Sequence, residues 1–302
     1  MPDARYMTHI NYAFGHVNET FNGVRIDNPE RLRMIAGLKK QNPGLKVLLS
    51  VGGWQSGRFS EMASADSTRR AFAADCLAKV EEFGLDGIDI DWEYPTSDAA
   101  GISSSPDDTR NYTLLMKELR RSLGNERLLT LASSAFAGYI DFRAVEPLVD
   151  FVNIMTYDIA TPPHHHSALR RSPMTGGVSC EESVARHIEA GIPAEKLVLG
   201  IPFYGRGGKE PGGFCDYRIL AESGEYIQRW DDKAQAPYLA DSTGRMVYTY
   251  DTPRSIALKC EFARRQGLAG AMYWDYDGDD SEGTLRKAVY MGLFRRNGSS
   301  RK

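Results

Sequence analysis

Short apolar segments alternate with longer amphipathic ones along most of the chain. The apolar segments have the length and the Val, Ile and aromatic content of buried strands, and they cover residues 8–15, 46–53, 85–93, 128–135, 151–158, 196–205 and 270–276. Between them lie helical patterns, among them 29–41, with Pro29 at a first helical position, and 67–84, which ends at Gly84. This alternation predicts an α/β fold in which crossover helices join parallel strands.

Two parallel architectures fit this alternation, an open doubly wound sheet and a barrel. A dinucleotide-binding sheet places a G-x-G-x-x-G motif after its first strand, and none follows residues 8–15. The dinucleotide-binding fold is therefore disfavoured, and we expect no cofactor.

One connection is much longer than the others. About fifty residues separate the segment 196–205 from the helical pattern at 252–267. They include strand-like pieces, GEYIQRW and GRMVYTY, so we expect a small inserted α+β subdomain rather than a loop. The expected domains are a barrel built from residues 1–205 and 253–295, the insertion at 206–252, and a polar C-terminal tail at 296–302.

Composition and charge exclude two classes of partner. The 302 residues carry a formal net charge of −3, and no run rich in Lys and Arg alternates with aromatic residues. We therefore expect neither nucleic acid nor an anionic membrane surface as a partner. No apolar stretch approaches the roughly 18–20 residues that a membrane-spanning helix needs. The first residues, MPDARYMTHI, lack the pattern of a secretory signal, so the chain is either cytosolic or lacks its leader.

Two features that could suggest a metal site do not support one. Cys76, Cys180, Cys215 and Cys260 form no C-x-x-C pair, which argues against zinc and leaves disulfides open. The three adjacent histidines at 164–166 lie on a Pro-rich segment, where neighbouring side chains rarely converge on one ion. We expect no metal site.

The segment LDGIDIDWEYP, at residues 85–95, carries four carboxylates within what is otherwise a buried strand. Alternate side chains of a strand point to opposite faces, so Asp89, Asp91 and Glu93 share one face. At roughly 3.3 Å per residue, Asp89 and Glu93 lie about 13 Å apart along the strand, with Asp91 midway. Asp86 is expected to cap the strand entrance structurally. The opposite, apolar face carries Ile88, Ile90 and Trp92.

Two interpretations of this acid column compete. The acids could form salt bridges or bind a hard cation, as clusters of Asp and Glu often do. However, the run contains no Lys or Arg, and buried carboxylates without partners are costly unless they take up or share protons. This arrangement raises the pKa of at least one acid toward the range of a general acid. Glu93 is the best candidate, because active sites of parallel α/β folds gather at the C-terminal ends of the strands.

Several motifs of the chain resemble those of glycoside hydrolase family 18 chitinases. DGIDIDWE at 86–93 matches the D-x-x-D-x-D-x-E signature, SVGG at 50–53 resembles the S-x-G-G strand, and MTYD at 155–158 resembles the M-x-Y-D strand. PFYGR at 202–206 is similar to the seventh strand of the family, and Trp274 to the tryptophan that closes its last strand. The resemblance implies a (β/α)8 barrel, and the long connection resembles the α+β insertion of one subfamily.

The resemblance also implies a retaining, substrate-assisted hydrolysis of chitin or chitooligosaccharides. Glu93 would protonate the glycosidic oxygen, and the carbonyl oxygen of the 2-acetamido group would attack the anomeric carbon. Asp91 would accept a hydrogen bond from the acetamido N–H and stabilise the positive charge on the ring. Asp89 would share a proton with Asp91, so that the column titrates as one unit.

Further residues are candidates for contacts with the sugar. By resemblance, Tyr157 bonds the acetamido oxygen, and the in-facing period of Met155 and Tyr157 agrees with this. Asp158 lies at the same strand end, and the indole of Trp274 would form the floor of the cleaved-sugar site. Other candidates for flanking sugar sites, each as well explained by a structural role, are Trp54, Phe14, Tyr204, Arg206 and Trp230.

Two other functions fit the same fold. A chitin-binding lectin would keep the aromatic residues and lose the acid, whereas Glu93 is present. An endo-β-N-acetylglucosaminidase acting on glycoprotein glycans shares the mechanism, but such relatives generally lack the insertion. We therefore expect chitin or its oligomers as the partner. By resemblance, the protein is secreted or periplasmic if the full-length form carries a leader; the sequence leaves its oligomeric state open.

The number of predicted strands is one short of a complete barrel. The apolar segments number seven, and 8–15 resembles the second barrel strand of the family. We therefore expect a barrel that lacks its first strand, with the first and last strands, around Asn11 and Met272, not joined into a complete wall. Two unpaired edges would lower stability and favour association.

Overall fold

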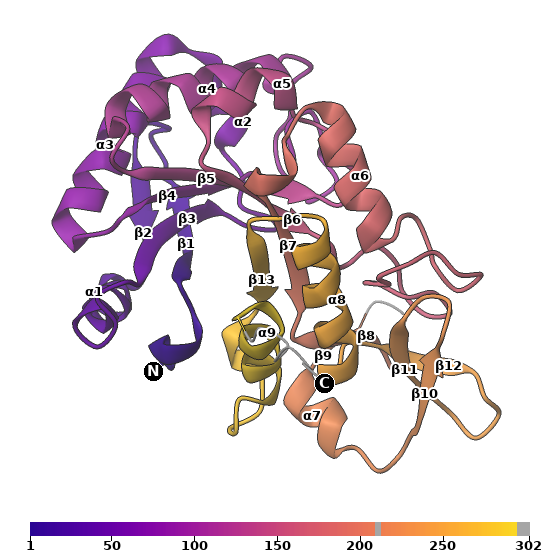
Figure 1. The fold of residues 1–302 in the computed structure, drawn as a ribbon. Helices are drawn as coiled ribbons and strands as arrows, with labels where there is room; N and C mark the ends of the chain where they lie inside the picture. Colours follow the sequence, from indigo (N-terminus) through magenta and orange to yellow (C-terminus); the bar gives the residue numbers. More distant parts are fainter. Residues whose placement is uncertain (209–212, 295–302) are drawn as a thin grey trace. The chain divides into compact units, whose positions relative to one another are not determined.

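The computed structural model describes residues 1–208 and 213–294 (Figure 1). The chain divides into two units. Unit 1 comprises Met1–Val152 with Glu189–Ile192, and unit 2 comprises Asn153–Ile188 with the chain from Pro193 on. The division falls inside one strand, β6 (Phe151–Met155).

Unit 1 contains a parallel sheet with one antiparallel edge strand. Neighbouring strands follow the order β5 (Leu128–Ser134), β4 (Gly87–Asp91), β3 (Lys46–Gly52), β1 (His9–Val17) and β2 (Val24–Ile26), of which β2 is antiparallel. The register pairs Ser50 of β3 and Thr130 of β5 with Asp89 of β4. Strand β4 is buried along its whole length, which is typical of a parallel strand covered on both faces.

Two of the helices of unit 1 have a boundary that the sequence predicted. The helices of this unit are α1 (Pro29–Ala36), α2 (Phe59–Ser64), α3 (Asp66–Phe83), α4 (Asp108–Leu123) and α5 (Phe142–Val145), with 3₁₀ helices at Ala4–Tyr6, Gly37–Lys40 and Glu146–Leu148. The predicted start at Pro29 is confirmed, and the Asn28 side chain caps it by accepting a hydrogen bond from the Arg31 N–H. The predicted end at Gly84 is also confirmed, and Gly84 has the left-handed φ of 62°.

Unit 2 holds the second group of parallel strands. Strand β7 (Leu197–Pro202) lies between β6 and β13 (Gly270–Trp274), and Pro202 pairs with Trp274. The helices are α6 (Cys180–Ala190), α7 (Tyr217–Glu222), α8 (Pro253–Arg265) and α9 (Thr284–Phe294), with 3₁₀ helices at Ala194–Lys196 and Tyr276–Gly278. Ile201 of β7, Ile256 of α8 and Leu285 of α9 belong to one buried apolar core.

A separate antiparallel sheet lies within the long connection of unit 2. Its strands follow the order β10 (Ile227–Asp231), β11 (Ala236–Ala240), β12 (Met246–Thr249), β8 (Tyr204–Gly207) and β9 (Phe214–Asp216). The two strand-like pieces of the sequence form β10 and β12, whereas β11 was not predicted. The boundaries proposed for an inserted subdomain at 206–252 stay a prediction, and the predicted tail at 296–302 lies outside the described residues.

The parallel α/β architecture is confirmed. Each apolar segment predicted as a strand contains one, namely β1, β3, β4, β5, β6, β7 and β13. In the described residues, β1 pairs with β2 and β3, and β13 pairs with β7. Closure of these strands into a barrel, and a missing first strand, stay predictions.

The cysteines are free thiols, and three of the four are buried. Burial raises the pKa of the Cys76 and Cys180 thiols, and that of Cys260 to about 12, so these side chains act as small apolar groups. Among the described helices, none is long and apolar enough to cross a membrane.

Gly52, the last residue of β3, passes very close to the backbone of β4. Its φ is +132°, and a Cβ at this position would lie 1.9 Å from the Asp91 carbonyl oxygen. We expect Gly52→Ala to lower the free energy of unfolding by roughly 3 kcal/mol or more, because alanine tolerates neither this φ nor the overlap.

The matched control is Gly37→Ala. Gly37 has a helical φ of −63° and no atom within 4 Å of an added Cβ, so its effect should stay within about 1 kcal/mol. Urea denaturation of both variants measures the two changes. A Gly52→Ala variant that is as stable as Gly37→Ala would contradict the close approach.

Candidate active site

Asp89 lies deep in the sheet of unit 1 and is held by the two neighbouring strands. Ser50 Oγ of β3 donates to Asp89 Oδ2 at 2.7 Å, and Thr130 Oγ1 of β5 donates to Asp89 Oδ1 at 2.6 Å. Both donors follow from the register, which pairs each of them with Asp89. Each oxygen of this buried carboxylate therefore accepts a hydrogen bond, and the side chain is fixed.

Asp91, two residues further along β4, has a different environment. Its side chain is buried, yet Asp91 Oδ1 has no hydrogen-bond partner among the described residues. Burial, Glu93 and Asp89 raise the pKa of Asp91 well above its usual range. A buried acceptor without a donor is unfavourable, so Asp91 is set to accept a donor from a bound molecule or to hold a proton.

Glu93 follows the end of β4 and lies beside an aromatic pair that the sequence analysis missed. Burial, the charge of Glu93 and a hydrogen bond to Glu93 raise the pKa of the Tyr94 hydroxyl. The Tyr94 ring stacks on Tyr139, with ring centroids 4.8 Å apart and planes at 8°. Tyr94 follows the acid directly in the sequence, so the segment 85–95 contained the signal; the stacking partner lies 45 residues away and could not be predicted.

The predicted separation of the two faces of β4 is confirmed. Ile88, Ile90 and Trp92 are buried, and Trp92 stacks on Phe59 of α2 with centroids 5.3 Å apart. The structural assignment of Asp86 also agrees with its contacts: Lys39 Nζ donates to it at 3.0 Å and the Val47 N–H at 2.8 Å. Burial alone would raise the pKa of Asp86, but these donors and Lys46 hold it below its usual value.

In unit 2, Tyr157 and Asp158 follow the end of β6, and two further predicted residues join them. The Tyr157 hydroxyl donates to Met272 Sδ at 3.9 Å, and the Tyr157 ring meets the edge of Tyr204 at 6.2 Å. Arg206 Nε of β8 donates to Asp158 Oδ1 at 2.6 Å. The structure thus brings Tyr157, Asp158, Tyr204 and Arg206 into one cluster within unit 2.

The histidine segment contributes to this cluster. His166 Nδ1 lies 3.6 Å from Asp158 Oδ1 and accepts a hydrogen bond from the Asp158 N–H. Burial alone would raise the pKa of Asp158, but His166 and Arg206 hold it well below its usual range. His165 instead faces Asp231 at 3.3 Å, and His164 is exposed. The adjacent histidines therefore have separate partners, and the described residues include no group of three side chains that could hold a metal ion.

The remaining predicted residues are Met155, Trp274, Trp54, Phe14 and Trp230. Met155 and Trp274 are the half-buried last residues of β6 and β13. Trp54 is 55% exposed, and Phe14 packs so closely on Gly53 that a Cβ there would lie 2.7 Å from its ring. Trp230 stacks under the Arg254 guanidinium of α8, 3.7 Å from the ring centroid. Their roles in sugar binding stay predictions.

Comparisons with known proteins agree on one family. A sequence profile described as "Glycosyl hydrolases family 18" matches residues 2–279. Chitinase A1 of Niallia circulans is 34% identical over 91% of this chain, which spans 46% of that protein's length. A family 18 N-acetylglucosaminidase from Paenibacillus barengoltzii has a similar structure, with a TM-score of 0.89 at 36% identity, over 96% of this chain and 94% of that one. The cell-surface chitinase ChiW from a Paenibacillus species gives 0.91 at 32% identity, over 99% of this chain and 41% of that one.

Asp91 and Asp86 have opposite environments, so we expect substitution by Asn to have opposite effects on stability at the two positions. The folded-state pKa of Asp91 is raised, so its ionisation opposes folding; the cost is absent below the unfolded pKa of about 3.9 and grows as pH rises toward the folded pKa. We expect Asp91→Asn to raise Tm at pH 7, by about 2–4 °C for each kcal/mol of repulsion removed, with the gain vanishing toward pH 4.

Asp86→Asn is the matched control. The folded-state pKa of Asp86 is lowered, so this acid stabilises the fold above the unfolded pKa and loses that effect as pH falls. Asp86→Asn should therefore lower Tm at pH 7 and differ little from the wild type at low pH. Thermal unfolding followed by circular dichroism from about pH 2 to 8 measures both, because the effect of Asp86 is lost only below the unfolded pKa of about 3.9. An Asp91→Asn variant that is less stable at pH 7 would contradict the raised pKa.

Proposed function

We propose that this chain, which belongs to glycosyl hydrolases family 18, hydrolyses β-1,4 linkages between N-acetylglucosamine units of chitin or chitooligosaccharides. The observation that carries the proposal is the acid column of β4. Asp89 has both oxygens bonded, Asp91 Oδ1 has no partner among the described residues, and Glu93 follows at the strand's C-terminal end. This arrangement provides one fixed acid, one open acceptor and one candidate proton donor.

In the proposed reaction, Glu93 is the general acid and then the general base. It protonates the glycosidic oxygen as the bond to the anomeric carbon breaks, and the acetamido carbonyl oxygen of the same sugar forms the new bond. Water then attacks the anomeric carbon of the oxazolinium, and Glu93 takes its proton. Two displacements at one carbon retain the configuration, and no protein nucleophile is needed.

Asp91 stabilises the charged intermediate in this proposal. Its open Oδ1 accepts the acetamido N–H, which orients the carbonyl oxygen for attack and offsets the positive charge that develops on the ring. Burial disfavours the charged form of the Asp91 carboxylate, and a cationic group beside it favours that form.

Tyr157 and Trp274 of unit 2 are proposed to act on the same sugar. The Tyr157 hydroxyl now donates to a thioether sulfur at 3.9 Å, a weak acceptor that an acetamido oxygen can replace. The Trp274 indole is proposed to stack on the apolar face of the pyranose. Asp158, Tyr204 and Arg206 are proposed to bind flanking groups, as are Met155, Trp54, Phe14 and Trp230.

The (β/α)8 barrel with an insertion at 206–252 is part of this proposal. It is supported by the likeness to the family 18 structure from Paenibacillus barengoltzii, which this chain covers almost completely. The antiparallel sheet from β8 to β12 supports the insertion.

One alternative product pattern has specific support. The structure from Paenibacillus barengoltzii is described as an N-acetylglucosaminidase, and this chain matches nearly its full length. Release of single N-acetylglucosamine units is therefore the second candidate activity. A lectin without catalysis is disfavoured by the presence of Glu93, and action on glycoprotein glycans by the inserted sheet.

Glu93→Gln should reduce hydrolysis of chitotetraose by about 10³-fold or more, because the amide keeps shape and polarity but has no proton to transfer. Asp91→Asn and Tyr157→Phe should each reduce it by about 10²-fold or more. Glu126→Gln, at an exposed position, is the matched control and should behave like the wild type. Calorimetry should find that Glu93→Gln still binds chitotetraose. Turnover by Glu93→Gln within about tenfold of the wild type would refute the assignment.

Substrate comparison tests the participation of the acetamido group. Chitotetraose should be cleaved and cellotetraose, which lacks that group, should be left intact. A thiazoline analogue of the oxazolinium should inhibit competitively. Chromatography of the products separates single units from larger fragments, and a high-mannose glycopeptide run in parallel tests the glycan alternative. Equal cleavage of both tetraoses would exclude the substrate-assisted mechanism.

A further inference from the structure

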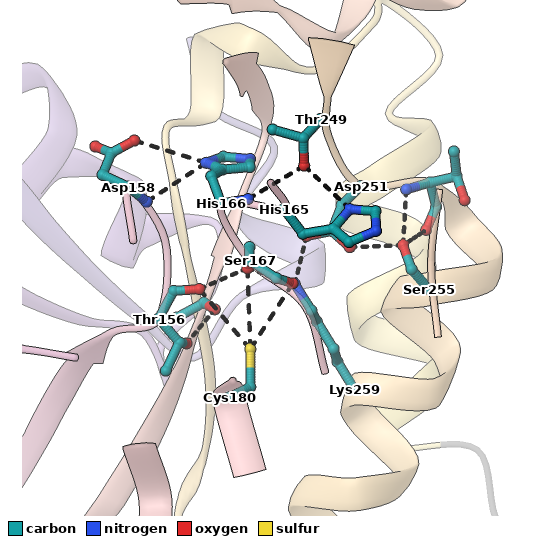
Figure 2. A network of polar contacts seen from close by, with 12 residues as sticks. Thr156, Asp158, His165, His166, Ser167, Cys180, Thr249, Asp251, Ser255 and Lys259 are labelled. Atoms are coloured by element: carbon teal, nitrogen blue, oxygen red, sulfur yellow. Dashed lines mark hydrogen bonds and ion pairs between the residues drawn. The ribbon is translucent and has the colours of Figure 1, made fainter. Parts of the chain in front are cut away.

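Directly before Tyr157 in the chain, Thr156 belongs to a buried polar network of unit 2 that also contains Ser167, Lys259 and Asp251 (Figure 2). The proposed reaction does not use this network. We infer that the Lys259–Asp251 ion pair positions Tyr157, acting through the Ser167 hydroxyl on the Thr156 carbonyl oxygen. The inference rests on the proposed function, because it gives Ser167, Lys259 and Asp251 a positioning role for a residue that is proposed to contact the substrate.

The ion pair is completely buried. Lys259 Nζ of α8 donates to Asp251 Oδ2 at 2.5 Å, and the exposed fractions of the two side chains are 0% and 1%. Ser255 Oγ donates to Asp251 Oδ1 at 2.6 Å, so both carboxylate oxygens are held. The desolvation cost of a buried ion pair commonly offsets its attraction, so stability alone is a weak reason for this arrangement.

The network has a fixed direction. An ammonium group has only donors, so Ser167 Oγ must accept the hydrogen bond from Lys259 Nζ, at 2.6 Å. The single proton of the hydroxyl then points to the Thr156 carbonyl oxygen, at 2.5 Å. Because Lys259 donates to Ser167 Oγ, the hydroxyl proton cannot point toward Lys259 and is free to bond the Thr156 carbonyl oxygen.

The network ends on the peptide group that carries the Tyr157 nitrogen. The Thr156 carbonyl and the Tyr157 N–H belong to one planar unit, so fixing the oxygen fixes the orientation at which Tyr157 leaves β6. On the other side, Thr156 Oγ1 donates to the Gly200 carbonyl of β7 at 2.6 Å. Thr156 is fully buried between these two hydrogen bonds. Tyr157 is only half-buried, and its hydroxyl makes a weak hydrogen bond to Met272 Sδ.

The histidine segment is also hydrogen-bonded to the chain that precedes α8. The His166 N–H donates to Thr249 Oγ1 at 3.2 Å, and Ser167 follows directly. Thr249 ends β12, two residues before Asp251. The segment 165–167 is therefore held at both its backbone and its Ser167 hydroxyl.

The test is a double-mutant cycle on kcat with chitotetraose. Ser167→Ala removes the bridging hydroxyl, and we expect kcat to fall about tenfold with KM little changed, because a small displacement of a substrate-positioning group slows the reaction. In the Tyr157→Phe background, Ser167→Ala should change kcat by less than about twofold, since the group it positions is already absent.

Two further variants sharpen the cycle. Lys259→Met combined with Asp251→Asn removes both charges together, leaves neither ion unpaired, and should reproduce the kinetics of Ser167→Ala. Ser172→Ala is the matched control: Ser172 is buried and donates to Asp231 Oδ2 at 2.7 Å, so it loses a comparable hydrogen bond away from Thr156. It should keep the wild-type kcat. If Ser167→Ala does not fold, Ser167→Cys retains the volume with a weaker donor and takes its place.

Hydrogen exchange tests the anchoring independently of activity. Peptides that cover residues 153–160 should exchange faster in Ser167→Ala than in the wild type or in Ser172→Ala. Equal slowing of kcat by Ser167→Ala in the wild-type and Tyr157→Phe backgrounds, or unchanged exchange, would overturn the inference. If the wild-type chain leaves chitotetraose intact, the proposed function fails, and the exchange comparison alone then supports or overturns the anchoring.

Discussion

A carboxylate can be buried only where donors or a proton compensate it, and this constraint governs the polar interior of both units. Asp89 receives a hydroxyl at each oxygen, and Asp251 receives Lys259 and Ser255. Asp279 likewise accepts from the backbone and guanidinium of Arg286. In the described residues, Asp91 Oδ1 is the one buried carboxylate oxygen that lacks a partner. The exception to the rule lies in the acid column, where the catalysis is proposed.

The surroundings of each carboxylate also determine whether its pKa is raised or lowered. Burial and the like charges of Glu93 and Asp89 raise the pKa of Asp91, whereas at Asp158 burial is outweighed by His166 and Arg206, which lower its pKa. Near neutral pH, Asp158 is therefore a permanent anion suited to fixed polar contacts, and Asp91 is an acid whose charge responds to a ligand. Asp91, at the end of β4, and Asp158, after the end of β6, thus have different roles in the proposed reaction, and their surroundings cause the difference.

The sequence predicted the strands and the acid column because both depend on local pattern. The alternation in β4 assigns Asp89, Asp91 and Trp92 to their faces without knowledge of neighbouring strands. It could not supply Ser50 and Thr130 as partners of Asp89, because the register between strands is set by the whole sheet. The strands β2, β9 and β11 were also missed, because they are short and carry too little alternation to stand out from a loop.

The sequence of α8 contains a signal for the buried ion pair, namely Lys259. Ile256, Cys260 and Ala263 of α8 form the buried stripe of an amphipathic helix, and Lys259 lies inside that stripe. A lysine at such a position is either incompatible with the helix or paired inside the core. The sequence could have indicated that a buried partner exists, but not that it is Asp251, eight residues earlier, since the chain turns into the helix between them.

In unit 2, the Lys259–Asp251 ion pair and the Ser167 hydroxyl together hold the Thr156 carbonyl. A serine hydroxyl can rotate, and Ser167 has two acceptors nearby, the Thr156 carbonyl at 2.5 Å and Cys180 Sγ at 3.9 Å. Lys259 donates to this oxygen, so the hydroxyl proton points away from Lys259, and the carbonyl is the nearer and stronger of the two acceptors. Unit 1 uses hydroxyls in the reverse sense, to hold the charge of Asp89 from both sides. In unit 1 the hydroxyls thus fix a buried carboxylate of the acid column, whereas in unit 2 a hydroxyl connects a buried ion pair to the backbone next to Tyr157, so the ion pair fixes geometry without contacting the substrate.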